Sequence, residues 1–65
     1  MDNNELIELI GYQILSIRDS GATNMFDIDK VREIAQEQRF DELVTYIDTN
    51  KDDYVLAIFT GKVNL

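Results

Sequence analysis

Residues 4–18 read NELIELIGYQILSIR, and this stretch decides the fold class. At about 100° per residue on an α-helix, its aliphatic side chains form one face, made of Leu6, Ile7, Ile10, Ile14 and Ile17. Asn3 or Asn4 suits the N-cap position, and Glu5 and Glu8 suit the positive end of the helix dipole. The pattern therefore predicts a helix over about 4–18 with one buried face.

The same stretch carries a second apolar set on its other side, made of Leu9, Tyr12 and Leu15. A helix that is apolar on two sides is usually buried on two sides. One interpretation places this helix centrally, with the third and fourth helices covering its two faces, and small bundles favour it. The other interpretation is that Leu9, Tyr12 and Leu15 form a surface for self-association or for a partner.

Three shorter helices are predicted after it. The loop 19–24 contains Gly21, a helix stop, and Asn24 or Asp27 then caps a helix over 28–38. Asp41 is the expected cap of a helix over 42–49. The polar residues 48–53 indicate a break, after which Thr49 or Asn50 caps a fourth helix that ends at Gly61; a continuous third helix is the alternative. We predict an all-α fold, a compact bundle of three to four short helices forming one domain over residues 1–65.

Two large apolar residues, Met25 and Phe26, stand in the predicted loop between the first two helices. Phe26 precedes the candidate cap Asp27, which is the position of a hydrophobic staple. We expect Phe26 to pack into the end of the core. The alternative is that Met25 is exposed and acts as an adaptable anchor for a partner.

Composition narrows the class of function. The 65 residues include neither cysteine nor histidine, so a structural zinc site is not expected. A formal charge of −7 disfavours binding to nucleic acid phosphates and to anionic membranes. The N-terminus has no signal-peptide pattern, and the longest apolar run, 54–59, is too short to span a bilayer. We expect a cytoplasmic protein without cofactors.

The run Asp48-x-Asn50-x-Asp52 matches the first three ligand positions of a calcium-binding loop. Such a loop also needs a glycine and a bidentate glutamate, where this chain has Asp53 and Phe59. An acidic turn is therefore the favoured interpretation. No histidine or cysteine is present as a base or thiol nucleophile, and short helices leave little room for a substrate pocket, so an enzyme is not expected.

Residues 10–27, IGYQILSIRDSGATNMFD, together with 31–34 and with 40–47, FDELVTYI, resemble a small family of unknown function carried by phages and prophages of Gram-positive bacteria. The likeness covers roughly residues 6–61. One departure is Arg39, where the resemblance leads us to expect a glycine before Phe40. The resemblance implies a setting, the cytoplasm of an infected bacterium, and no catalytic activity.

Together these observations predict a non-enzymatic protein that binds and inhibits a host protein with a basic surface. A nucleic-acid-handling defence enzyme is one candidate target, because carboxylates can take the place of phosphates in a basic channel. The candidate partner-binding residues are Asp41, Glu42, Asp48, Asp52 and Asp53. The alternative is a small homodimeric regulatory or assembly module that associates through Leu9, Tyr12 and Leu15.

Overall fold

Helix α1 (Asn3–Ser20) is the longest element of the computed structural model, which describes residues 2–65. Its N-cap is Asp2, not Asn3 or Asn4 as predicted, because the Asp2 carboxylate accepts a hydrogen bond from the Glu5 backbone N–H at 2.8 Å. Gly21 ends the helix in the left-handed conformation, with φ 67°, as its position predicts. Helix α1 thus begins and ends slightly outside the predicted range.

Three shorter helices follow: α2 (Ile28–Glu37), α3 (Asp41–Thr49) and α4 (Lys51–Thr60). Residues 2–65 contain no strand, so the prediction of a small all-α bundle is confirmed. The chain breaks at Asn50, where φ is −139°, and the alternative of a continuous third helix is wrong. Gly61 ends α4 with φ 76°. Each of these four helices is too short or too polar to cross a lipid bilayer.

The caps of the later helices are only partly as predicted. Asp27 caps α2 by accepting a hydrogen bond from the Lys30 N–H at 3.3 Å. The N-cap of α3 is Phe40 and not Asp41, which is already helical, and neither Phe40 nor Asn50 makes a side-chain capping bond. A backbone N–H in the first turn of α3 instead finds its hydrogen-bond acceptor on a residue of another helix.

That residue is Gln13, a buried side chain of α1 that the apolar pattern did not identify. Its Oε1 accepts a hydrogen bond from the Leu43 N–H at 3.0 Å, and its Nε2 donates to Glu42 Oε1 at 3.0 Å. Leu43 lies in the first turn of α3, where backbone N–H groups have no partner within the helix. Gln13 supplies that partner and joins α1 to α3.

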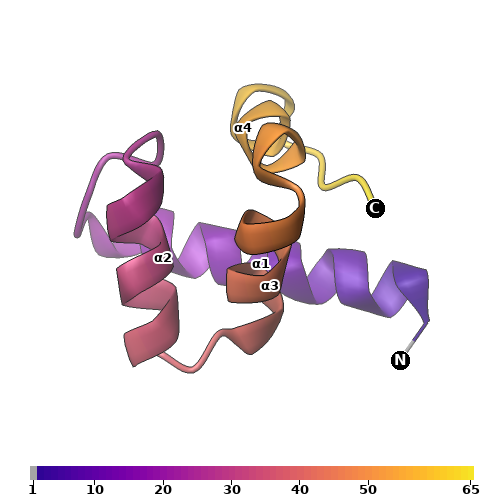
Figure 1. Cartoon of the computed structure of the whole chain (residues 1–65), viewed down its shortest axis with the longest axis horizontal. Helices are drawn as coiled ribbons and strands as arrows, with labels where there is room; N and C mark the ends of the chain where they lie inside the picture. The colour runs from indigo at the N-terminus through magenta and orange to yellow at the C-terminus, as the bar shows by residue number, and fades with distance from the viewer. Residues whose placement is uncertain (1) are drawn as a thin grey trace.

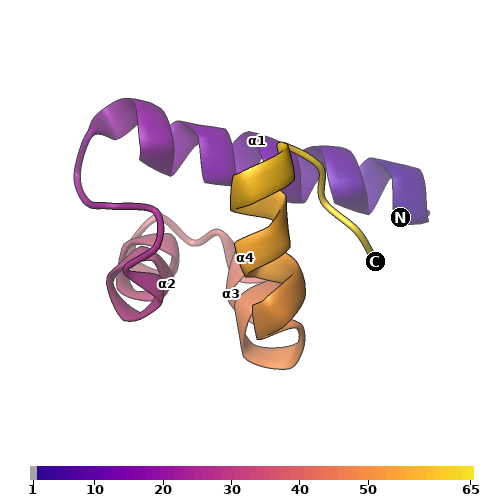
Figure 2. The ribbon, with the colours of Figure 1, turned by 90° about the horizontal axis from the view of Figure 1, so that it is seen from above.

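Helix α3 is the centre of the bundle. It packs against each of the other three helices, and α1 also packs against α2. Figure 1 shows α2 and α3 crossing α1, and Figure 2 shows both on the same side of α1. The prediction that α1 lies centrally, covered on both faces, is therefore wrong.

The core is formed by apolar side chains from all four helices and the α1–α2 loop. Its buried members are Ile10, Ile14, Ile17, Met25, Val31, Ala35, Leu43, Tyr46, Ile47, Tyr54 and Ala57. Both core tyrosines use their hydroxyls: Tyr54 donates to the Met25 carbonyl at 2.7 Å, and Tyr46 donates to the Asn64 carbonyl at 2.9 Å. These bonds tie α4 to the α1–α2 loop and the C-terminal segment to α3.

The corner between α2 and α3 contains Arg39, the position where the resemblance leads us to expect glycine. Arg39 has φ 60°, a left-handed conformation that glycine adopts without steric cost. The Phe40 N–H donates to the Ala35 carbonyl at 2.8 Å, and the Arg39 N–H donates to the Gln36 carbonyl at 3.1 Å. This pair of bonds is a Schellman motif, so the glycine-type corner is formed with an arginine in the glycine position.

Candidate functional site

The five predicted partner-binding carboxylates do not form one face. Asp48 is held by Arg32, which approaches its two oxygens at 2.6 and 2.9 Å. These hydrogen bonds lower the pKa of the Asp48 carboxyl. Because Arg32 already offsets its charge, Asp48 is less available to a basic partner than an unpaired carboxylate would be.

Asp41 and Glu42 lie together in the first turn of α3, at one end of a groove. The hydrogen bond from Gln13 lowers the pKa of Glu42, with a further contribution from the backbone N–H of Glu42 itself. Asp41 is exposed and Glu42 is half-buried. Asp52 and Asp53 start α4 instead, with Asp52 exposed and Asp53 partly covered.

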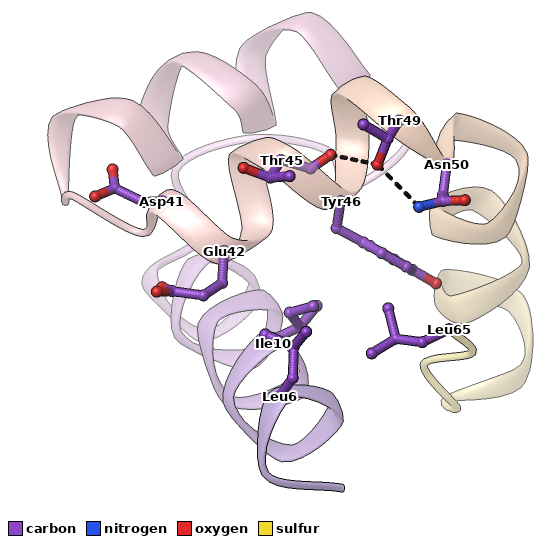
Figure 3. Close-up of a pocket in the computed structure, with 9 residues that line it drawn as sticks. All are labelled: Leu6, Ile10, Asp41, Glu42, Thr45, Tyr46, Thr49, Asn50 and Leu65. Carbon is purple, nitrogen blue, oxygen red and sulfur yellow. Dashed lines mark hydrogen bonds between the residues drawn. The ribbon is translucent and has the colours of Figure 1, made fainter. Parts of the chain in front are cut away.

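The groove lies between the first half of α1, helix α3 and the C-terminal segment, and its volume is about 330 Å³. Its apolar lining consists of Leu6, Ile10, Tyr46 and Leu65, with Thr45, Thr49 and Asn50 along the α3 wall. Figure 3 shows the carboxylates of Asp41 and Glu42 at one end and Leu65 at the other. We call this feature the α1–α3 groove.

A second feature is a cluster of exposed apolar side chains, which we call the aromatic surface: Phe26, Leu56 and Phe59. The exposed fractions of these residues are 47%, 49% and 72%. The rings of Phe26 and Phe59 contact each other, with centroids 5.0 Å apart and planes inclined at 50°. Leu56 is one turn before Phe59 on α4, so the two share a helix face. The apolar run 54–59 thus lies on two sides of α4. Tyr54 and Ala57 are buried in the core, and Leu56 and Phe59 are exposed on the outer side.

The prediction that Phe26 packs into the core is wrong, and Met25 takes that place. The Asn24 side chain accepts a hydrogen bond from the Phe26 N–H at 2.8 Å, and the Asn24 carbonyl accepts one from the Asp27 N–H at 2.9 Å. This turn, with the Tyr54 hydroxyl on the Met25 carbonyl, fixes the segment with Met25 buried and Phe26 exposed.

The predicted self-association residues lie on α1. Tyr12 is 65% exposed and Leu15 is 45% exposed, whereas Leu9 is half-buried. No other described helix covers Tyr12 or Leu15 to the extent that the central-helix interpretation requires. Within residues 2–65, no three acidic side chains gather closely enough to hold a metal ion.

One family model matches the chain, over residues 6–62, and its description is Domain of unknown function (DUF5049). The match agrees with the resemblance to a family of unknown function, and its extent is close to the one predicted. No curated protein and no solved structure matches the chain.

Proposed function

The chain belongs to the DUF5049 family, and we propose that it is a non-enzymatic domain whose function is to bind another protein. The observation that carries this proposal is the aromatic surface. Contiguous exposed apolar patches on soluble proteins often mark surfaces that contact another molecule. Aromatic residues are also enriched where protein interfaces are energetically strongest.

The negative charge of the chain favours a partner protein with a basic surface. The chain has a formal charge of −7, and Asp52 lies one turn before Leu56 on α4, so a carboxylate flanks the aromatic surface. Complementary charge around an apolar contact speeds encounter and rejects wrong partners. Among the predicted carboxylates, Asp52 is the one best placed to contribute at this surface.

The biological role that we propose follows the resemblance to phage and prophage proteins. In that setting the domain acts in the host bacterial cytoplasm, where it binds and inhibits a host protein with a basic surface. A nucleic-acid-handling defence enzyme fits this description, because its basic channel would attract an acidic domain.

Affinity capture from host lysate tests the proposal, with Phe59→Ser against the control Tyr12→Ser, which removes an exposed aromatic ring from another helix. We expect Phe59→Ser to reduce capture of the host protein at least tenfold, the scale of an interface hot spot, and Tyr12→Ser to leave it intact. Capture should also weaken as salt rises. Wild-type capture by Phe59→Ser would refute the role of the aromatic surface.

A homodimeric module is the second candidate, favoured by the exposure of Tyr12 and Leu15 on α1. Sedimentation equilibrium distinguishes the two. A dimer that dissociates in Tyr12→Ser and Leu15→Ser, but not in Phe59→Ser, would support this alternative. A monomer at all accessible concentrations would exclude it.

A further inference from the structure

The α1–α3 groove differs in position and chemistry from the aromatic surface. Leu6 and Ile10 belong to the first half of α1, whereas Phe26 follows the other end of that helix. Figure 1 shows these two ends of α1 on opposite sides of the molecule. A ligand in the groove therefore leaves the α1–α2 loop free.

Apolar side chains and carboxylates line different parts of this groove. Apolar side chains of Leu6, Ile10 and Leu65 offer a place for an aliphatic group to leave water. Asp41 and Glu42 provide negative charge at one end only (Figure 3). The volume of about 330 Å³ is at the lower end of the range for ligand sites, enough for one or two side chains.

Glu42 is prepared to meet a cation. The amide of Gln13 binds its Oε1, fixing the carboxylate and favouring its ionised form. Among the described residues, Glu42 makes no ion pair, so its negative charge is left for a ligand. Asp41, next to it and exposed, adds a second charge.

The α3 wall of the groove favours a peptide over a small free cation. Thr45 and Thr49 lie one turn apart on α3, and Asn50 follows at its end. Thr49 donates to the Thr45 backbone carbonyl at 2.8 Å and accepts from Asn50 at 2.9 Å, so the Thr49 and Asn50 side chains are held in place beside the Thr45 hydroxyl. Hydroxyl and amide groups both donate and accept hydrogen bonds, so this wall can bond the peptide groups of a chain lying along the groove.

We infer that the α1–α3 groove binds a peptide segment of another protein that presents an aliphatic side chain beside a lysine or arginine. The aliphatic group occupies the space near Leu6, Ile10 and Leu65, and the cation reaches Asp41 and Glu42. Long basic side chains suit this arrangement because their methylene stems cover apolar surface while the charge stays at the rim. The inference rests on the proposed function only in that the ligand is a protein.

Nuclear magnetic resonance titration of the isotope-labelled chain tests this directly. The probe is acetyl-Ala-Leu-Lys-Arg-Leu-Ala-amide, and the control peptide has glutamine in place of both basic residues. We expect the probe to shift the amide signals of Leu6, Ile10, Glu42 and Leu65, and to bind about three- to tenfold tighter than the control, the range for two exposed ion pairs. Its affinity should fall as salt rises.

The double variant Asp41→Asn with Glu42→Gln should bind the probe about three- to tenfold more weakly. Its matched control, Asp29→Asn with Glu33→Gln, makes the same charge change on α2 and should bind normally. Equal affinity for the two peptides, shifts confined to other parts of the chain, or an unaffected double variant would overturn the inference. The salt dependence of the wild type decides the question if the double variant does not fold.

The failure of this inference is distinguishable from the failure of the proposed function. Phe59→Ser should bind the probe as the wild type does, because Phe59 does not line the groove. If the probe does not bind while Phe59→Ser loses capture of a host protein, the inference falls and the proposed function stands. If the probe binds while Phe59→Ser keeps wild-type capture of the host protein, the inference stands and the proposed role of the aromatic surface falls.

Discussion

The amide oxygen of Gln13, in the middle of α1, accepts a hydrogen bond from the backbone N–H of Leu43 at 3.0 Å. This bond performs the task of an N-cap for α3, whose own N-cap residue, Phe40, has no oxygen in its side chain. A buried polar side chain with both amide atoms in use fixes one alignment of two helices.

Replacing Gln13 should therefore cost more than an ordinary polar substitution. We expect Gln13→Ala to lower the free energy of unfolding by about 1–3 kcal/mol, because it leaves the buried Leu43 N–H without a partner. Gln36→Ala, at an exposed glutamine of α2, should change it by less than about 0.5 kcal/mol. Urea denaturation measures both, and equal losses would show that the cap does not matter.

The left-handed conformation of Arg39 leads to the second prediction. A non-glycine residue is destabilised there by about 1–2 kcal/mol, and glycine avoids this steric cost. Glycine also makes the unfolded chain more flexible, which cancels part of the stabilisation. Arg39→Gly should therefore stabilise the chain by up to about 1 kcal/mol. Gln38→Gly, at a neighbour with φ −84°, should destabilise it. Thermal melts of the two variants would contradict this if both moved in the same direction.

Met25 and Phe26 should differ in the sense opposite to the sequence prediction. Met25→Ala empties a buried site and should cost about 2–5 kcal/mol. Phe26→Ala removes an exposed ring and its contact with Phe59, for about 1 kcal/mol or less. Chemical denaturation gives the two values. A larger loss for Phe26→Ala would mean that the loop is folded the other way in solution.

Stability should fall in alkali through Tyr54. Burial raises the pKa of its hydroxyl from 10.0 to about 12. The folded state therefore holds the Tyr54 proton more tightly than the unfolded state does. This difference contributes fully to the free energy of unfolding below pH 10, where both states keep the proton, and the contribution is lost as pH rises toward about 12. Tyr54→Phe should be less stable at neutral pH and should lose less further stability over this interval. Unfolding curves at stepped pH would contradict this if the two chains ran parallel.

Local signals predicted most of the fold correctly. The spacing of Ile10, Ile14 and Ile17 identified the buried face of α1, and Gly21 and Gly61 marked helix ends because their left-handed conformations are local properties. Met25 and Phe26 were assigned the wrong way round because both suit an apolar position. Only the distant Tyr54 hydroxyl and the Asn24 turn decide between them.

The candidate surfaces depend on relationships that a linear pattern does not contain. Sequence reasoning selected Asp48 for its charge, and its neutralisation by Arg32 depends on how α2 meets α3. The contact of Phe26 with Phe59 joins residues from a loop and from α4. The burial of Gln13 could have been predicted from one feature of the sequence, because this polar residue lies next to the apolar face of α1.

The central position of α3 also has a consequence for the order in which the chain becomes structured. With nine residues and a cap borrowed from α1, helix α3 is shorter than isolated helices that persist in water. Helix α1 has eighteen residues, its own Asp2 cap and a glycine stop. An excised peptide of residues 2–21 should keep some helicity, whereas one of residues 40–50 should be a random coil. We therefore expect α1 to form first and α3 to form against it, with α2 and α4 packing against α3 only after that step.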